Sequence, residues 1–432
     1  MQNEASIIEK DKQEKAVLVG LIADCLSENE NSSEESLDEL EALLSTAGGV
    51  SCGRVLQIRP APDPRSFIGE GKVAELKEMI SANECTMAVF DNELTPSQNR
   101  VLEDELGVHV IDRPALILDI FASRARTREG RLQVELAQYK YLLPRLTGMW
   151  SHLVRQTASG GAGPIGTRGP GETQLETDRR HIRRKITKLE RELEEVRRIR
   201  GTQRRKREKN SVPVIALVGY TNAGKSTLLN RLTGAGIPAN DRLFDTLDTT
   251  TRRLQISPVT EALISDTVGF ISRLPHHLIE AFKATLEELV YADLLLHVID
   301  SSNPQWRQQA YVVDELIEQL GAGATACIRV FNKADLGIQI GADLGNTESV
   351  FISSVTGEGT DKLLRKIEDT LNSGRKRIIL HFPYDKSGLV EAVHRDSSVL
   401  RTDYLEDCIE IEAILNPDTY GRLREYAQEA VK

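Results

Sequence analysis

Short apolar runs alternate with amphipathic stretches along the first quarter of the chain. The apolar runs predict buried strands, and the stretches between them predict helices. This alternation is typical of a small parallel α/β domain, which we expect over residues 16–123, after a polar, disordered lead at residues 1–15. The expected strands are residues 16–23, 55–58, 87–90 and 108–111, and the expected helices are residues 37–46, 71–80 and 95–106.

Two longer helical patterns follow this region. The first runs from Leu116 to Leu143, where Pro144 is expected to end the helix, and the second from around Glu172 to Arg207. In both, apolar residues recur at alternating spacings of four and three, as in a coiled coil. The two seams predict an antiparallel helical hairpin over residues 124–209, built from Leu132, Leu136, Tyr139 and Leu143 on one helix and Ile182, Ile186, Leu189, Leu193 and Val196 on the other.

The remaining chain predicts two further domains. Residues 210–374 again alternate apolar strands with helices, as a P-loop domain does. Residues 375–432 are expected to form a small α+β domain that carries no recognisable chemistry. Its expected elements are strands at residues 377–381, 399–404 and 408–415, and helices at residues 388–394 and 419–428.

Residues 219–227 fit G-x-x-x-x-G-K-[ST], the phosphate-binding loop, with an apolar strand before them and a helical stretch after them. Gly219 and Gly224 allow the tight turn that aims backbone N–H groups at phosphates. Lys225 would supply charge to the β- and γ-phosphates, and Ser226 a hydroxyl to Mg²⁺. A chance glycine-rich turn is the alternative. The predicted phosphate-binding residues are Gly219, Tyr220, Thr221, Asn222, Ala223, Gly224, Lys225, Ser226 and Thr227.

Three further elements, each after an apolar strand, argue against chance. Asp266 and Gly269 belong to a D-T-V-G element that would hold Mg²⁺ through water and lie next to the γ-phosphate. An N-K-A-D element ends at Asp335, whose carboxylate can accept from the N1–H and exocyclic amine of guanine, an arrangement that adenine does not offer. A third element, Ser353-Ser354-Val355, would place a backbone N–H against the guanine oxygen. The sequence therefore predicts a domain that binds GTP and GDP through Asp266, Thr267, Val268, Gly269, Asn332, Lys333, Asp335, Ser353, Ser354 and Val355.

Charge is unevenly distributed along the chain. The formal net charge is −10, and residues 1–50 hold twelve acidic and three basic side chains. Residues 179–209, on the second hairpin helix, instead hold fifteen Lys or Arg and five Glu. A basic segment of this length can contact several phosphates and predicts RNA binding. A solvated helix face is the alternative.

A glycine-rich stretch, residues 160–171, lies between the hairpin helices. A loop this long at the tip of a hairpin is typical of a functional segment, with a flexible connector as the alternative. We expect a backbone-rich finger for a nucleic-acid pocket, with Trp150 available for stacking on a base. The predicted RNA contacts are Arg155, Arg168, Arg183, Arg184 and Lys185.

Bulk properties favour a cytoplasmic location, and we expect a monomer. No apolar run approaches the roughly 20 residues of a membrane span, and the polar N-terminus does not resemble a signal peptide. The five cysteines are scattered, which fits reduced thiols better than disulfides or a zinc site. Peripheral membrane association is the alternative location.

With these motifs in view, the chain resembles the HflX family of translation-factor GTPases over residues 50–375. The resemblance implies an N-terminal α/β domain with a helical hairpin, a Ras-like GTPase domain and a variable C-terminal domain. It also implies binding to the large ribosomal subunit, stimulation by it, and splitting of stalled ribosomes under stress. The matching stretches are FIGEGKVAEL (67–76), FDNELTPSQNRVLE (90–103), RARTREGRLQVELAQYKYLLPRLTG (124–148), GTRGPGETQLETDRR (166–180) and DTVGFISRLPHHLIEAFKATLE (266–287).

The resemblance also assigns the switch residues. Thr246, in the family's F-x-T-L pattern, is the expected second Mg²⁺ ligand, with Thr250 as runner-up, while Thr249 departs from the proline that relatives usually carry. The predicted catalytic residues are Lys225, Thr246 and Gly269, and the predicted metal ligands are Ser226, Thr246 and, through water, Asp266.

Phe270 lies where many GTPases place a glutamine that orients water. A phenyl ring cannot do this, so we expect slow intrinsic hydrolysis, with activation from the ribosome or from K⁺ held at Asn222. The resemblance also allows a second nucleotide, ATP, at residues 67–72 of the N-terminal domain. Two alternative functions stay open: a GTPase of large-subunit assembly, and a nucleotide-gated scaffold whose hairpin binds protein.

Overall fold

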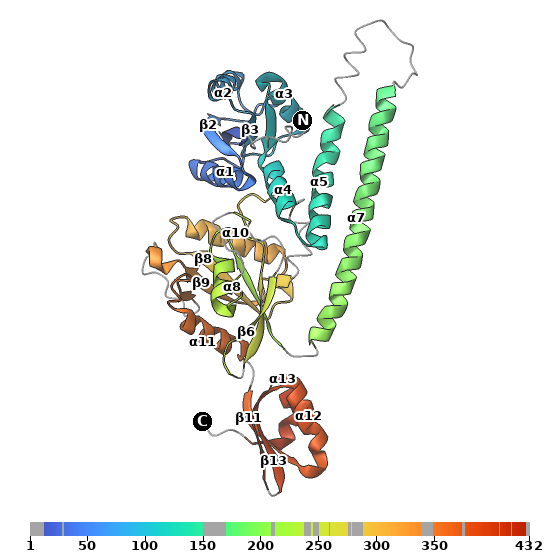
Figure 1. The fold of residues 1–432 in the computed structure, drawn as a ribbon, viewed down its shortest axis with the longest axis vertical. Helices are drawn as coiled ribbons and strands as arrows, with labels where there is room; N and C mark the ends of the chain where they lie inside the picture. The colour runs from blue at the N-terminus through green and yellow to red at the C-terminus, as the bar shows by residue number, and fades with distance from the viewer. Residues whose placement is uncertain are drawn as a thin grey trace, which may run out of the picture. The chain divides into compact units, whose positions relative to one another are not determined.

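The computed structural model describes residues 13–27, 30–149, 170–208, 212–236, 243–244, 250–258, 260–274, 278, 288–337, 349–373, 376–405, 407–415 and 417–428. Two compact units make up the chain. The N-terminal unit holds residues 1–193 with the short segments 242–244 and 272–282, and the C-terminal unit holds the rest. The predicted mixed α/β architecture is confirmed (Figure 1).

A four-stranded parallel sheet organises the N-terminal unit, with the order β2-β1-β3-β4. Its apolar faces pack against helices in one cluster that includes Val19, Leu76 and Phe90. The strands are β1 (Lys15–Ala23), β2 (Val50–Arg59), β3 (Met87–Phe90) and β4 (His109–Asp112), and the helices are α1 (Glu34–Ala47), α2 (Glu70–Asn83) and α3 (Pro96–Leu106).

Local sequence sets where these helices begin. Ser33 caps α1 by accepting a hydrogen bond from the Ser36 N–H, and Thr95 caps α3 in the same way. Asp112 caps the next helix, α4 (Arg113–Arg124), by accepting from the Ala115 N–H. These caps place each helix directly after its strand or turn.

The single helix expected from Leu116 to Leu143 is wrong. The chain forms α4 and then a separate helix, α5 (Arg128–Met149), because Ala125 is extended and the Thr127 hydroxyl starts a new helix by accepting from the Gly130 N–H at 3.0 Å. Pro144 does not end α5. Just beyond it, the Arg145 guanidinium bonds Asp112 at 2.9 Å, the Leu94 carbonyl at 3.0 Å and the Tyr141 carbonyl at 3.2 Å, contacts that hold the helix across the proline.

The second hairpin helix is α7 (Pro170–Glu208). Leu136 of α5 packs with Leu189 and Leu193 of α7, and Leu132, Tyr139 and Ile186 surround them. Arg128 pairs with Glu192, and Lys140 with Glu190. The low-numbered end of α5 therefore meets the high-numbered part of α7, as an antiparallel hairpin requires.

The C-terminal unit contains a six-stranded sheet of order β10-β9-β8-β5-β7-β6, parallel except for β6. Helices pack on it around a buried cluster that includes Leu217, Ile264 and Val330. The strands are β5 (Val214–Gly219), β6 (Thr250–Gln255), β7 (Glu261–Asp266), β8 (Leu294–Asp300), β9 (Ala326–Asn332) and β10 (Ser349–Phe351), and the helices are α8 (Lys225–Thr233), α10 (Trp306–Gln319) and α11 (Thr360–Leu371).

The last segment of the chain forms a β-α-β-β-α-β arrangement with an antiparallel sheet of order β12-β13-β11-β14. This topology is that of a ferredoxin-like domain. Its own buried cluster includes Leu380, Phe382 and Ile411. The elements are β11 (Lys376–Pro383), α12 (Ser387–Asp396), β12 (Ser398–Tyr404), β13 (Cys408–Leu415), α13 (Pro417–Leu423) and β14 (Ala427–Gln428).

The helix expected over residues 419–428 is wrong at its end. Helix α13 stops at Leu423, and Gln428 pairs with Ile379 as part of β14. Tyr426 explains the change, because its ring lies 5.2 Å from that of Phe382 and packs on the apolar cluster. Within the described part of the chain, no helix is long and apolar enough to cross a membrane.

Candidate nucleotide site

The phosphate-binding loop joins the carboxyl end of β5 to α8, the edge at which parallel sheets bind ligands. Gly219 and Gly224 have φ of 154° and 93°. A Cβ on Gly219 would lie 2.3 Å from the Val298 carbonyl oxygen, and one on Gly224 would lie 2.2 Å from the Asn332 side-chain nitrogen. Only glycine fits at either position, so both are required for the turn itself.

Lys225 starts α8 and is fully enclosed. Its Nζ donates to the carbonyl oxygens of Gly219 at 3.0 Å and Tyr220 at 2.7 Å. Burial lowers the pKa of Lys225 to about 8, and the nearby Asp266 carboxylate opposes that shift only in part. A bound phosphate would supply the negative charge that this buried ammonium lacks.

The metal-binding residues predicted on the loop and on β7 are adjacent. The Ser226 hydroxyl donates to Asp266 Oδ2 at 2.6 Å. Hard oxygen donors of this kind suit Mg²⁺, which binds through few protein ligands together with nucleotide phosphates. The pair therefore fits the ion. Thr246 lies outside the described residues, and Thr250, its runner-up, is paired with Asp266 in the β6–β7 ladder.

Gly269 lies against the phosphate-binding loop. A Cβ there would be 2.9 Å from Thr221 Cγ2 and 3.1 Å from Lys225 Nζ. The next residue, Phe270, donates its N–H to the Gly219 oxygen at 3.1 Å and accepts from the Thr221 N–H at 2.7 Å. The Phe270 ring is buried, so this residue fixes the backbone beside the loop. The Thr221 hydroxyl is buried there and has no hydrogen-bond partner within the described chain.

Asn332 connects three of the predicted nucleotide elements. Its Nδ2 donates to the Ala223 carbonyl at 2.9 Å, and its Oδ1 accepts from the Ser354 N–H at 2.9 Å and the Ser354 hydroxyl at 2.8 Å. The backbone of Asn332 also accepts from Ser301. The structure thus brings the phosphate-binding loop, the N-K-A-D element and the segment after β10 to one place.

The remaining predicted residues surround this centre. Lys333 has a φ of 61° and pairs with Asp300 at 2.8 Å, while Asp335 is exposed in a short 3₁₀ turn. Thr267 donates to the Leu217 carbonyl at 2.6 Å, a contact inside the sheet. Ser353 is buried, whereas Val355 is 69% exposed. The Asp335 carboxylate and the Val355 side chain are therefore accessible at this edge.

Two supporting residues were not predicted from the sequence. Asp300 ends β8 and holds Lys333, and Arg231 of α8 donates to the carbonyl of Ser354 at 3.2 Å and to that of Val355. An acidic residue at the end of an apolar strand was the available signal for Asp300. Nothing in the sequence marks Arg231, since its partners lie more than 120 positions away.

The predicted RNA contacts divide into two groups. Arg183, Arg184 and Lys185 are exposed on α7, and Lys185 Nζ donates to the Tyr139 hydroxyl at 2.7 Å, which raises the pKa of that lysine. Arg155, Arg168 and Trp150 lie outside the described residues.

At residues 67–72, where a second nucleotide is predicted, polar groups are engaged within the domain. The Gly69 N–H donates to Gln57 at 2.9 Å, the Ser66 hydroxyl donates to the Ile68 carbonyl at 2.8 Å, and Lys72 pairs with Glu75. These contacts favour a structural turn. The second nucleotide site stays a prediction.

Comparison with known proteins identifies the family to which the chain belongs. Three family profiles match the chain: "GTP-binding GTPase N-terminal" at residues 34–122, "GTP-binding GTPase Middle Region" at residues 124–207, and "50S ribosome-binding GTPase" at residues 214–333. A crystal structure of SsGBP with GDP is 24% identical, covers 84% of this chain and 99% of its own, and has a TM-score of 0.47, a likeness too low to carry the assignment.

The family assignment rests instead on curated relatives of higher sequence identity. The protein named GTPase HflX of Lacrimispora saccharolytica is 46% identical over 97% of both chains. The protein of the same name from Escherichia coli K12 is 44% identical over 86% of both chains. Identities of this size over nearly the whole length, together with the three profiles, show that the chain belongs to the HflX family of GTPases.

Proposed function

We propose that this GTPase binds the large ribosomal subunit through its helical hairpin and uses GTP to dissociate stalled or stress-damaged ribosomes. The observation that carries the proposal is the exposed basic face of α7, where Arg183 and Arg184 point to solvent while the apolar seam faces α5. Lysine and arginine on a rigid helix suit the phosphates of RNA. The description of the matching profile as a 50S ribosome-binding GTPase supports the same partner.

Within the nucleotide site we propose the following roles. Lys225 and the loop amides would bind the phosphates, Ser226 and Thr246 would hold Mg²⁺ directly and Asp266 through water, and Gly269 would contact the γ-phosphate. Asp335 reads guanine, and the Ser354 and Val355 backbone closes over the base. Mg²⁺ supplies charge neutralisation at the phosphates when bound.

We further propose that hydrolysis needs an activator, because the Phe270 ring is buried and carries no group that could orient water. The ribosome is the first candidate. K⁺ is the second, since Asn222 of the phosphate-binding loop matches the position at which some GTPases hold a monovalent cation. Equal hydrolysis rates in Na⁺ and K⁺, together with no stimulation by ribosomes, would contradict this part. The proposed location is the cytoplasm, where ribosomes act.

Sedimentation of purified ribosomes tests the main proposal. Ribosomes are mixed with the protein and GTP, a non-hydrolysable GTP analogue or GDP, and separated on a sucrose gradient. We expect loss of monosomes and co-migration of the protein with large subunits in the analogue but not in GDP. Binding only to precursor particles would favour a role in large-subunit assembly. No binding to any particle would favour a nucleotide-gated protein scaffold.

Charge reversal tests which surface is used. Arg183→Glu with Arg184→Glu should abolish particle binding, and raising the salt concentration should weaken binding of the unaltered protein steeply. Lys362→Glu with Arg365→Glu on α11 is the matched control, because it makes the same charge change at exposed residues of the GTPase domain. Lys185 is left in place, since it bonds Tyr139 across the hairpin. Equal loss in both double variants would contradict hairpin binding.

A further inference from the structure

Two short segments that are close in sequence to Thr246 and Gly269 belong to the N-terminal unit. Residues 242–244 directly precede the switch segment that holds Thr246, and residues 272–282 begin three positions after Gly269. Each is joined through the chain to the nucleotide site, and Phe244, Ser272 and Arg273 contact side chains of the N-terminal unit. The contacts that hold these segments therefore affect the geometry of the nucleotide site.

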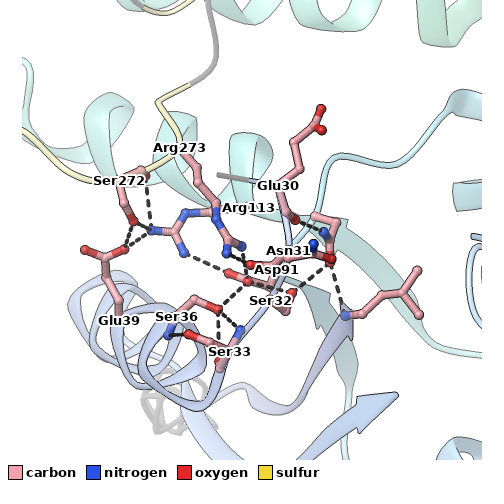
Figure 2. A network of polar contacts seen from close by, with 12 residues as sticks. Glu30, Asn31, Ser32, Ser33, Ser36, Glu39, Asp91, Arg113, Ser272 and Arg273 are labelled. Carbon is pink, nitrogen blue, oxygen red and sulfur yellow. Dashed lines mark hydrogen bonds and ion pairs between the residues drawn. The ribbon is translucent and has the colours of Figure 1, made fainter. Parts of the chain in front are cut away.

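Arg273 provides the first anchor. Its guanidinium pairs with Asp91 and bonds the Asn31 backbone oxygen. Asp91, directly after β3, is buried and also pairs with Arg113 at 2.8 Å. We call Asp91, Arg113, Ser32 and Ser36 the Asp91 socket. Figure 2 shows Arg273 entering it beside Arg113.

The Asp91 socket is completed by neutral donors. The hydroxyls of Ser32 and Ser36 donate to Asp91 at 2.8 and 2.7 Å. Burial alone would raise the pKa of Asp91, but Arg113 and Arg273 outweigh it and hold that pKa below its usual value. A carboxylate held by two guanidinium groups and two hydroxyls stays ionised and defines one position for Arg273.

Ser272 adds a second contact beside the Asp91 socket. Its hydroxyl donates to Glu39 at 2.5 Å and accepts from Arg113 at 3.2 Å, and its carbonyl accepts from Arg113 at 3.3 Å (Figure 2). Arg273 itself has a φ of 56°, in the left-handed region that a non-glycine residue rarely adopts. Since buried ion pairs add little net stability, this arrangement is better explained by a need to fix position.

Phe244 provides the anchor for the other segment. It is 2% exposed, and its ring lies 4.7 Å from that of Phe121 on α4 in an edge-to-face arrangement. Its φ of 55° is again left-handed. Phe244, two positions before Thr246 in the sequence, is thus fixed to the N-terminal unit.

We propose that Arg273, acting through the Asp91 socket, is a positioning residue that holds Gly269 ready for the γ-phosphate, and that Phe244, through its contact with Phe121, is a second positioning residue. Gly269 already lies against Thr221 and Lys225, and the chain from Phe270 to Ser272 that links it to the anchor is buried or bonded. GDP has no γ-phosphate, so the anchors favour GTP over GDP. The proposal rests on the family's GTPase activity and is independent of ribosome binding.

Nucleotide titration of the full-length protein tests this. Dissociation constants are measured with Mg²⁺ for a fluorescent GDP and a fluorescent non-hydrolysable GTP analogue. Arg273→Ala should weaken binding of the GTP analogue by roughly 5- to 150-fold, the usual range of coupling between sites, and leave GDP binding unchanged. Arg273→Lys, which keeps the charge beside Asp91, should restore part of the loss. Arg252→Ala, at an exposed arginine of β6, is the control.

Further variants separate positioning from folding. Asp91→Asn should reproduce the loss, and the double variant with Arg273→Ala should be no worse than either single change. If Asp91→Asn unfolds the N-terminal unit in a thermal melt, Phe244→Ala replaces it and should give the same selective loss. An unchanged ratio of GTP-analogue to GDP affinity in Arg273→Ala, or tighter binding of the analogue, would overturn the proposal.

Discussion

The side chain of Asn332 donates a hydrogen bond of 2.9 Å to the backbone oxygen of Ala223, inside the phosphate-binding loop. Asn332 belongs to an element usually discussed for guanine recognition, yet its amide holds the loop that binds phosphate. With Oδ1 bound to Ser354, the same side chain joins the phosphate-binding loop to the segment after β10. One buried group thus connects the elements predicted to bind the base and the phosphates.

We predict that Asn332→Ala weakens binding of GTP and GDP alike. The change leaves the Ala223 carbonyl and the Ser354 N–H buried without this partner, and each such group costs about 1–3 kcal/mol. Affinity should fall roughly tenfold or more for both nucleotides. Titration with fluorescent nucleotides measures this. Asn303→Ala, at a loop after β8, is the control, and a loss confined to GTP would contradict the shared role.

The Lys225 pKa makes nucleotide affinity depend on pH. With that pKa near 8 in the free site, Lys225 loses its proton above this pH, whereas a bound phosphate keeps it charged. Binding then takes up a proton, so the dissociation constant for GDP should be flat from pH 7 to 8 and rise towards tenfold per pH unit above 8. Phosphate itself, with a second pKa of about 6, is already ionised in this window.

The lowered pKa of Lys225 also makes the free energy of unfolding depend on pH, in a direction that can be checked. Without nucleotide, the folded protein binds fewer protons than the unfolded chain between pH 8 and the ordinary lysine value of 10.5. The contribution of Lys225 to the free energy of unfolding therefore rises with pH across this window and is most unfavourable below it. Lys225→Met should remove both dependences. A pH-independent dissociation constant up to pH 10 would show that Lys225 is charged in the free site.

We predict that the apolar seam between α5 and α7 stabilises the N-terminal unit. Leu189 is 6% exposed and packs with Leu136 and Leu193, so Leu189→Ala should lower the free energy of unfolding of the N-terminal unit by about 2–4 kcal/mol. Leu142→Ala, at a leucine of α5 that is 45% exposed, should change it by less than about 0.5 kcal/mol. Urea unfolding followed by circular dichroism compares the two. Equal effects would mean that the seam does not form.

Local patterns predict the parts of this fold that local chemistry determines. Most parallel strands of the two larger sheets are apolar runs, and the glycine, lysine and serine of the phosphate-binding loop lie at fixed spacing, so both can be predicted from the sequence. The antiparallel edge strand β6 is largely polar and was not predicted. The break at Ala125 depends on one hydroxyl cap at Thr127, and the continuation through Pro144 depends on Arg145 reaching Asp112. The sequence pattern alone contains neither partner.

The same limit applies to the candidate site. Arg273 and Asp91 are 182 positions apart and belong to no shared motif, so their pairing appears only once the chain is folded. The second role of Asn332 likewise depends on Gly224 bringing the loop within reach of β9. Motifs name the residues that touch a ligand, whereas the residues that hold those groups in place come from tertiary structure.

The last domain should be dispensable for intrinsic GTP hydrolysis. Among the residues that the structure describes, the hydrophobic cluster of the GTPase sheet contains none beyond Leu371, and the cluster around Phe382 contains none before Ile378. Removing residues 374–432 therefore leaves the first core intact, and the hydrolysis rate should stay within about twofold because distant sites act independently.

A second truncation, which removes more of the chain, provides the control for this experiment. Ending the chain after Gly359 also removes Leu363 and Ile367, which are buried in the GTPase cluster, and should abolish nucleotide binding through unfolding. Hydrolysis is followed by phosphate release and folding by thermal melting of both truncated proteins. Loss of folding in the longer of the two would mean that the ferredoxin-like domain completes the GTPase core, and that the two clusters depend on each other.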